Sequence, residues 1–454
     1  MRFLRAAALL GASVAAAAAH ALPNDAAVHA ILAQRISQKQ GVGFAVVLVD
    51  KGGTRIVTEG KADSAGKPIT ADTEFEIGSI TKTFTALLLA DAILRGAAKA
   101  DEAVAPLLPA PAPGLTRDGK SVTLGQLASH TSGLPRTPAN FAPANPADPY
   151  ADYDAARLLA FLGGSPLQRT PGESYEYSNV GGGTLGYALT RKTGGYEATL
   201  RAGVLTPLGM NDTGVVLSPA QAARFARGHG WDLEPVANWN LNESIVGAGG
   251  IRSTATDMAR YLRAAAGWDS TPLGAAFKLA ETPVTDTAQP TMKAGLGWHV
   301  TQTGGRTMIW HNGQTGGFAS MLVFDPAAGE GVVVLANASI RVDDLAIHLV
   351  DSTRKLAEPP RARTAVKVDP SVYDRVAGRY ELAPNFVVTV RRDGDRIFAQ
   401  VTGQSNFEIL PESELEYFYK VADAQLSFRR DGDGKVSRVI LHQGGRDVPG
   451  KRLD

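Results

Sequence analysis

SITKTFTALLLADAILR, residues 79–95, is the stretch that decides the fold. Its apolar side chains, among them Phe84 and Leu88, occupy nearly every face of a helix, which is typical of a helix buried on all sides. Gly96 follows in a position that suits the left-handed residue after a helix. The pattern predicts a core helix whose first turn is polar and contains Ser79 and Lys82.

Ser79 and Lys82 form the first candidate catalytic pair. A serine hydroxyl is a weak nucleophile near neutral pH and needs a group that takes its proton. The i, i+3 spacing places both side chains on one helix face, and burial in an apolar helix lowers the pKa of a lysine. Unpaired N–H groups at the helix N-terminus also favour developing negative charge. Taken alone, the pair fits an N-cap serine and a solvated lysine at least as well.

Tyr177-Ser178-Asn179 is the second candidate motif, because its side chains can transfer a proton or bind a substrate. A phenol close to an ammonium ionises more easily and can relay a proton. The amide of Asn179 can donate to and accept from a substrate amide. A structural tyrosine in a Gly-flanked loop is the alternative interpretation.

His311-Asn312-Gly313 is the third motif. A cationic or hydrogen-bonding side chain followed by a glycine lets a substrate backbone approach a strand edge. For a lone histidine, a packed or surface position is the ordinary alternative.

The order of apolar stretches predicts an α/β fold. β-branched stretches lie at both ends of the first 356 residues, and helical and Pro/Gly-rich stretches lie between them. The expected strands are 42–49, 54–59, 297–301, 308–310, 320–324 and 331–335, and a surface helix is expected over 343–356. This order predicts one sheet made of distant segments, flanked by helices, with an inserted helical subdomain.

A different pattern begins after a Pro- and Arg-containing linker at 359–367. Residues 368–454 alternate apolar and polar at period two, and Arg-Arg-Asp-Gly-Asp occurs at 391–395 and again at 429–433. Asp-Gly between alternating stretches is a strong hairpin signal, whereas the ligand spacing and terminal Glu of a calcium loop are missing. The tail is expected to be a small antiparallel β-domain without catalytic residues.

The N-terminus and the composition limit the classes of function. A basic start, an apolar run and the small residues around His20 predict a cleaved signal peptide over 1–21, hence a periplasmic or secreted protein without a stable membrane span. A formal net charge of +1 argues against nucleic acid as a partner. The absence of cysteine excludes disulfides, a thiol nucleophile and a Cys-based zinc site. Because the histidines are scattered, no metal is expected, and no cofactor either.

Together, the order and spacing of the three motifs resemble the serine β-lactamases and DD-peptidases, especially the class C-like branch. Similar phrases also occur at 127–135 (LASHTSGLP), 207–210 (PLGM) and 249–254 (GGIRST). The resemblance covers about residues 25–356 and implies a β-lactamase/transpeptidase-like fold for 22–358. The tail, 368–454, resembles the lipocalin-like domain appended to some of these hydrolases.

The resemblance implies the catalytic roles. Ser79 would attack a carbonyl and form an acyl-enzyme, and Lys82 and Tyr177 would share the proton transfers. The backbone N–H groups of Ser79 and Gln314 would form the oxyanion hole, which is typically a dominant catalytic contribution.

It also implies the substrate contacts. Asn179 would bind the side-chain amide of the substrate. His311 would lie near the substrate carboxylate and Tyr177, and Gly313 completes the Lys/His-x-Gly pattern. The implied partner is a small molecule or peptide: a D-amino-acid peptide, a β-lactam or an ester.

Two departures from the class C pattern bear on the substrate. His311-x-Gly replaces Lys-Thr-Gly, and Arg136 and Thr137 lie where a glutamine is usual. Both argue against efficient β-lactam hydrolysis and leave the acylation chemistry intact. The leading expectation is a DD-peptidase or D-amino-acid peptidase. A class C-like β-lactamase, a small-ester hydrolase and a penicillin-binding sensor without turnover are the alternatives.

Overall fold

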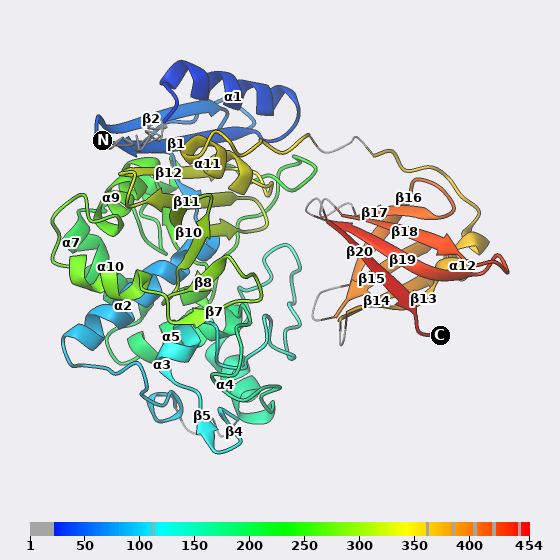
Figure 1. The fold of residues 1–454 in the computed structure, drawn as a ribbon, viewed down its shortest axis with the longest axis horizontal. Coiled ribbons are helices and arrows are strands. Elements are labelled where there is room, and N and C mark those ends of the chain that lie inside the picture. The colour runs from blue at the N-terminus through cyan, green and yellow to red at the C-terminus, as the bar shows by residue number, and fades with distance from the viewer. Residues whose placement is uncertain are drawn as a thin grey trace, which may run out of the picture.

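The computed structural model describes residues 22–109, 112, 114–359, 363–383, 386–402, 406–419, 424–443 and 446–454. The predicted signal peptide, 1–21, lies outside the described residues, as does part of the predicted linker. The domain boundaries 22–358, 359–367 and 368–454 stay predictions. Figure 1 shows two parts joined by the segment after α11, a sheet with helices and a separate barrel.

The larger part is built on an eight-stranded antiparallel sheet in the order β2-β1-β12-β11-β10-β9-β8-β7. Its strands are β1 (Gly43–Asp50), β2 (Gly53–Gly60), β7 (Thr285–Asp286), β8 (Met292–Ala294), β9 (His299–Thr303), β10 (Arg306–Gln314), β11 (Ala319–Asp325) and β12 (Glu330–Ala336). In β1, Val46 pairs with Val57 on one side and with Val334 on the other. The N-terminal hairpin thus joins strands from the other end of this part of the chain, which confirms the predicted sheet of distant segments.

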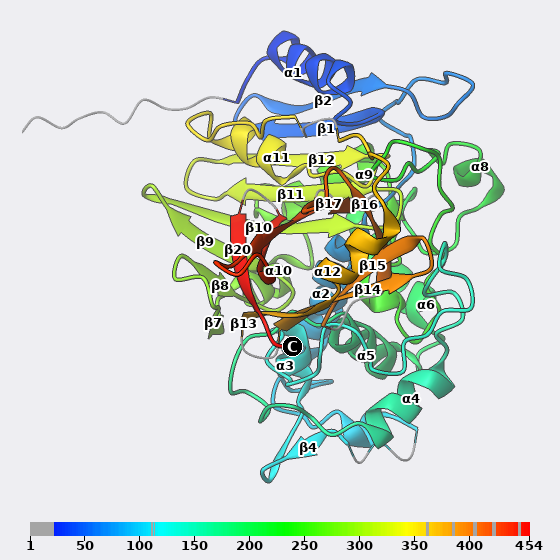
Figure 2. The same ribbon diagram turned by 90° about the vertical axis from the view of Figure 1, so that its right-hand side faces the viewer.

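Both faces of this sheet are covered, which explains why β1 is apolar at almost every position. Phe44 and Leu48 lie in the core beneath α1 (Asp25–Ser37) and α11 (Asp343–Val350). Val47 lies in the core of the other face, with α2 (Thr81–Leu94), α9 (Ala255–Ala265) and α10 (Gly274–Glu281). Figure 2 shows α1 and α11 on the same side of the sheet.

The helical subdomain lies between the two groups of strands in the sequence. Its helices are α3 (Leu124–Ala128), α4 (Ala155–Gly164), α5 (Asn179–Thr190), α6 (Tyr196–Leu200), α7 (Thr206–Leu208) and α8 (Pro219–Ala222). Two short antiparallel strand pairs accompany them: β3 (Phe75–Glu76) with β6 (Arg252–Ser253), which are distant in the sequence, and the hairpin of β4 (Thr116–Arg117) with β5 (Lys120–Ser121). Helix α2 is buried from Thr81 to Ala90, as its uniformly apolar sequence predicts.

Two predicted helix boundaries are wrong by a few residues. The surface helix expected over 343–356 ends at Val350, because the Asp351 side chain accepts hydrogen bonds from the backbone and hydroxyl of Thr353 and turns the chain. The core helix begins at Thr81, and Ser79 lies in a preceding 3-10 turn, η1 (Gly78–Ile80).

The tail is a closed eight-stranded antiparallel barrel in which each strand pairs with the next along the chain. Its strands are β13 (Gly378–Ala383), β14 (Phe386–Asp393), β15 (Arg396–Val401), β16 (Asn406–Pro411), β17 (Glu416–Tyr419), β18 (Ala424–Arg430), β19 (Val436–Gln443) and β20 (Arg446–Arg452). The barrel has a core of its own, with Tyr380 and Phe428 fully buried. The first Asp-Gly forms the predicted hairpin, because Gly394 adopts φ +59° between β14 and β15. Up-and-down closure of eight strands is the architecture of lipocalins.

Candidate active site

The serine turn is held against strand β10 by two glycines. Gly78 has φ +51°, and a Cβ placed there would lie 2.6 Å from the backbone N of Gln314. At Gly313 a Cβ would lie 2.0 Å from the carbonyl oxygen of Ile77. A methyl group at either position would push the turn and the strand apart. The two glycines thus keep the backbone N–H of Gln314 beside the turn that carries Ser79.

Lys82 is 3% exposed and has three hydrogen-bond partners, all of them uncharged. Its Nζ lies 3.0 Å from Ser79 Oγ, 3.0 Å from Asn179 Oδ1 and 2.6 Å from the carbonyl oxygen of Ala248. Burial lowers the pKa of Lys82 well below its usual value, and the charge of Arg136 lowers it further. The structure thus places the predicted pair together and favours a neutral amine.

The hydrogen-bond partners of Lys82 Nζ determine the direction in which the lone pair of the neutral amine points. The oxygens of Asn179 and Ala248 can only accept hydrogen bonds. A neutral lysine has two hydrogens, and both are needed for these two oxygens. Its lone pair is then left for Ser79, whose hydroxyl can donate to it. This arrangement orients Lys82 as a proton acceptor for the serine.

Tyr177 also hydrogen-bonds to Ser79, but its ionisation differs from the prediction. Burial raises the pKa of Tyr177 to about 12, and the hydrogen bond to Ser79 and the charge of Arg136 offset only part of that rise. The expectation that a neighbouring ammonium lowers the pKa of this tyrosine is wrong, because the desolvation of the phenol dominates and Lys82 favours its neutral form. Tyr177 therefore stays protonated near neutral pH and can donate a proton.

Asn179 occupies the first turn of α5. The hydroxyl of Ser178 caps this helix by accepting from the backbone N of Gly181 at 2.8 Å. One turn on, Gly182 lies against Lys82, since a Cβ there would be 3.1 Å from Lys82 Cε. The Gly-rich start of α5 thus packs directly against the lysine.

His311 lies on β10, is 1% exposed and is held in one tautomer. Its Nδ1 is 2.6 Å from the carbonyl oxygen of Asn312, so Nδ1 carries the hydrogen and donates it. Burial lowers the pKa of His311 well below its usual value, with nearby His299 and Lys82 as further causes. The buried Nε2 has no hydrogen-bond partner. His311 thus presents an acceptor, in contrast to the lysine of Lys-Thr-Gly.

Further side chains surround Tyr177 that the sequence did not single out as site residues. The Nδ1 of His130 accepts from the backbone N of Ser178 at 3.2 Å, and its ring lies 4.5 Å from that of Tyr177. The Nε2 of His299 is 3.0 Å from the hydroxyl of Tyr175. His130 was inside the family-like phrase at 127–135, which was a usable signal. No signal in the sequence pointed to His299, because only the pairing of β9 with β10 brings it to the active site.

His299 also contacts its neighbour on β10. Its ring stacks on that of His311, with centroids 5.0 Å apart. Burial lowers the pKa of His299 to about 4. The wall of the site next to Tyr177 is therefore formed by uncharged imidazoles.

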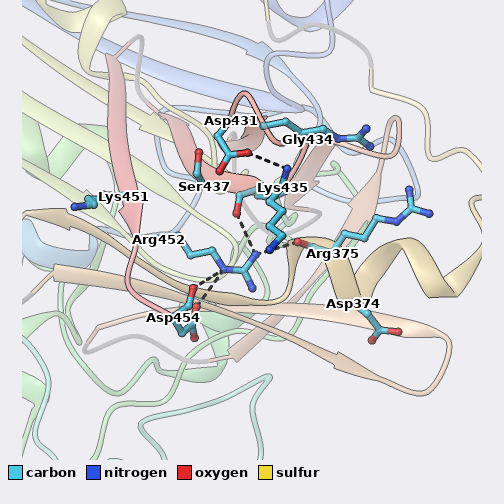
Figure 3. A pocket seen from close by; sticks show the side chains of 11 residues that line it. Asp374, Arg375, Asp431, Gly434, Lys435, Ser437, Lys451, Arg452 and Asp454 are labelled. Carbon is cyan, nitrogen blue, oxygen red and sulfur yellow. Dashed lines mark hydrogen bonds and ion pairs between the residues drawn. The ribbon is translucent and has the colours of Figure 1, made fainter.

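A second concave region, on the barrel, has a different character (Figure 3). There Arg452 donates to Asp454 and to the backbone carbonyls of Arg375, Val436 and Ala377. These contacts tie the C-terminal strand to the start of the barrel, so this pocket is stabilised by its own charges.

Across the described part of the chain, no group of three His, Asp or Glu side chains is arranged to hold a metal ion. In the same ranges, every helix is too short or too polar to cross a bilayer.

A serine hydroxyl, a buried lysine with a lowered pKa and a strand N–H beside them form the arrangement expected of a serine hydrolase. The family model described as Beta-lactamase matches residues 28–355, and a domain of unknown function (DUF3471) matches 362–452. The chain therefore belongs to the Beta-lactamase family.

Relatives and solved structures agree with this assignment. Penicillin-binding protein 4* of Bacillus subtilis (strain 168) is 24% identical over 84% of this chain and 88% of its own. D-alanyl-D-alanine-carboxypeptidase/endopeptidase AmpH of Escherichia coli (strain K12) is 27% identical over 65% of this chain and 80% of its own. The D-alanine carboxypeptidase AmpC from Burkholderia cenocepacia superposes with a TM-score of 0.62 at 26% identity, covering 72% of this chain and 97% of that one. A class C β-lactamase has a TM-score of 0.64 at 23% identity over 74% and 97% of the two chains, which shows the shared fold.

Proposed function

We propose that this protein hydrolyses amide bonds of D-amino-acid-containing peptides through an acyl-enzyme on Ser79. The observation that carries the proposal is the set of three contacts at Lys82 Nζ. Two carbonyl oxygens bind the hydrogens of the amine, so its lone pair faces the serine hydroxyl. A buried lysine in this state is a general base that needs no carboxylate to orient it.

The reaction follows from that geometry. Lys82 takes the proton of Ser79 as Oγ bonds to the substrate carbonyl carbon. The N–H groups of Ser79 and Gln314 donate to the oxygen that gains the negative charge. Tyr177, protonated and hydrogen-bonded to Ser79, gives its proton to the leaving nitrogen as the C–N bond breaks, and recovers a proton from Lys82. Water then attacks the carbonyl carbon of the ester and gives a proton to Lys82. The bond between Ser79 Oγ and that carbon breaks, Lys82 returns the proton to Oγ, and the acid product is released.

The substrate class rests on His311 and on the relatives. A histidine in the Lys/His-x-Gly position, together with a carboxypeptidase/endopeptidase and a penicillin-binding protein among the relatives, supports a peptidase over an efficient β-lactamase. A β-lactamase of Escherichia coli (strain K12), 28% identical over 72% of this chain, keeps β-lactam hydrolysis as the alternative to be tested.

The test uses three acyl donors on one protein. A labelled penicillin, a nitrophenyl ester and a D-Ala-D-Ala peptide are incubated with the full chain, and both adduct and product are followed. We expect the adduct on Ser79 by mass spectrometry, turnover of the peptide, and loss of both in Ser79→Ala. Ser121→Ala, which removes an exposed hydroxyl on β5, is the matched control. Full activity of Ser79→Ala would overturn the proposal, whereas an adduct without turnover would identify a penicillin-binding sensor.

We also propose that the chain is exported with its first 21 residues removed, on the basis of the apolar run and the small residues before Leu22. N-terminal sequencing of protein recovered outside the cytoplasm should begin at Leu22. A mature protein that still starts at Met1 would contradict it.

A further inference from the structure

Arg136 lies at the rim of the active site with its guanidinium free. The side chain is exposed, and Cζ lies 5.0 Å from the centroid of the Tyr177 ring. Among the residues that the structure describes, the guanidinium contacts this ring and makes neither a hydrogen bond nor an ion pair. Arg157, in the same subdomain, instead pairs with Asp152 at 3.0 Å. Arg136 thus keeps its donors available to a ligand.

The backbone of Arg136 is fixed although its side chain is free. Its carbonyl oxygen accepts from the backbone N of Asn179 at 3.0 Å. The carbonyl oxygen of the preceding residue, Pro135, accepts from the hydroxyl of Ser178 at 2.7 Å. Arg136 is therefore anchored to the first turn of α5, beside Asn179, which the family resemblance places against the side-chain amide of the substrate, a group on the acyl side of the bond that is cleaved. An anchor held in place this way has less freedom to lose when a ligand binds.

The other basic groups near Ser79 do not offer a positive charge. His311 carries its hydrogen on Nδ1 and directs a lone pair from the unpartnered Nε2. A lone pair repels a carboxylate oxygen. Lys82 uses its hydrogens on Asn179 and Ala248. Of the groups described around the serine, Arg136 is the cation that can bind an anion.

We propose that Arg136 binds a carboxylate in the acyl portion of the substrate, beside Asn179, and makes this enzyme selective for acyl donors that carry a negative charge. The planar guanidinium suits two parallel hydrogen bonds to one carboxylate. The inference rests on the proposed function, since it names the substrate class of the same site.

Two pairs of esters locate the recognised charge. The first pair is the 4-nitrophenyl monoester of glutaric acid and its methyl ester, which differ by one charge on the acyl side. The second pair is the 3-carboxyphenyl and phenyl esters of acetic acid, which differ by one charge on the leaving group. The readout is the ratio of kcat/KM for the charged and the neutral member of each pair, measured on the full chain at two salt concentrations.

We expect wild type to favour the charged member of the first pair and Arg136→Gln to lower that ratio about 10- to 100-fold, the range for a lost charge-assisted hydrogen bond. Arg136→Lys should keep part of the preference for the charged ester, because lysine retains the positive charge but lacks the planar guanidinium that donates two parallel hydrogen bonds. Arg95→Gln, at the far end of α2 from Ser79 and paired with Asp91, is the matched control and should leave the ratio unchanged. Higher salt should lower the wild-type ratio.

The outcomes separate this inference from the proposed function. If a neutral fluorophosphonate labels Ser79 and the first ratio is the same in wild type and Arg136→Gln, the anion site is refuted and the serine mechanism stands. If Arg136→Gln changes only the second ratio, the acyl-side placement is refuted. If Ser79 is not labelled in wild type, the proposed function itself fails.

Discussion

At the scale of single residues, the protonation state of Lys82 is the most testable consequence of the structure. We expect Lys82→Ala to slow acylation on the order of 100-fold or more, as for loss of a positioned base. Lys82→Arg should be nearly as damaging, because a guanidinium keeps its proton and the pocket is closed by Gly182 and Ala248. Pre-steady-state acylation rates of wild type, Lys82→Ala and Lys82→Arg test this expectation.

The same residue predicts the sign of the pH dependence. Burial lowers the pKa of Lys82, so the reactive neutral amine is populated above that lowered pKa and is lost as the pH falls through it. Acylation should therefore rise with pH through the lowered pKa of Lys82, while Tyr177 stays protonated. Lys99→Arg, an exposed substitution after α2, should leave the profile unchanged. Wild-type rates in Lys82→Arg would remove the lysine from the mechanism.

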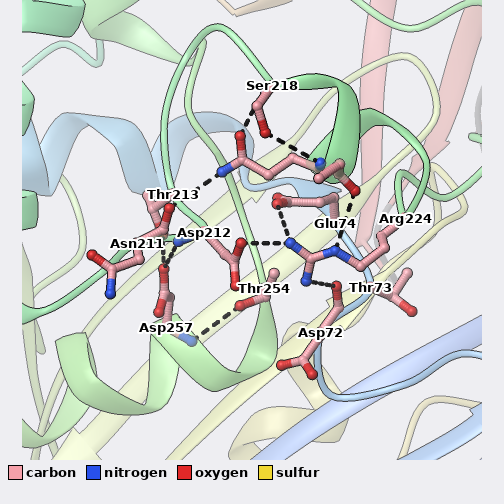
Figure 4. A network of polar contacts seen from close by, with 12 residues as sticks. Asp72, Thr73, Glu74, Asn211, Asp212, Thr213, Ser218, Arg224, Thr254 and Asp257 are labelled. Atoms are coloured by element: carbon pink, nitrogen blue, oxygen red, sulfur yellow. Dashed lines mark hydrogen bonds and ion pairs between the residues drawn. The ribbon is translucent and has the colours of Figure 1, made fainter.

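At the scale of elements, the segment that leads into strand β3 carries a buried acid, Glu74. Glu74 is 0% exposed, and neither of its carboxyl oxygens has a hydrogen-bond partner. Figure 4 shows the surrounding polar network, in which Arg224 approaches Glu74 Oε1 at 3.9 Å while it pairs with Asp212. Burial raises the pKa of Glu74 to about 8, with nearby Asp212 and Asp257 raising it further and Arg224 opposing. Glu74 is thus neutral at neutral pH.

This predicts how stability changes with pH. Between the ordinary pKa of 4.5 and about 8, the folded state holds a proton that the unfolded state has released, so the free energy of unfolding should fall as pH rises through that window. Glu74→Gln, which cannot ionise, should reduce this fall. Some slope will persist, because burial raises the pKa of Glu76 to about 7. Urea unfolding at pH 5, 6, 7 and 8 measures how the free energy of unfolding changes with pH, and substitution of the exposed Glu234, Glu234→Gln, is the control. An unchanged slope in Glu74→Gln would show that Glu74 ionises normally.

At the scale of the whole molecule, we expect the catalytic part to fold and react without the barrel. Every side chain placed in the site precedes residue 315, and the barrel has a core of its own. A chain that ends at Glu358 should therefore fold and still label Ser79 with a fluorophosphonate, although its substrate range can change. Circular dichroism verifies folding, and labelling rates are compared with those of the full chain. A truncated protein that folds but does not react would make the barrel part of the active site.

The sequence by itself determined what depends on spacing along the chain. The i, i+3 interval placed Ser79 and Lys82 together because a helix imposes it. Period two and Asp-Gly predicted the antiparallel tail because alternation and a tight turn are local properties. Motif order with the family resemblance identified Tyr177, Asn179 and the 311–314 segment, which the structure brings to the same site.

Only the tertiary structure decided the charges within that site. Whether a side chain is ionised depends on how much water and which partners surround it, and those come from segments far apart in the sequence. The expectation for Tyr177 failed for this reason, since its burial was not visible in Tyr177-Ser178-Asn179. His299 reached the site only through the pairing of β9 with β10. The proposed anion site at Arg136 also depends on the tertiary structure. Folding buries His311, which lowers its pKa, and leaves the guanidinium of Arg136 over the ring of Tyr177 without an ion-pair partner among the described residues.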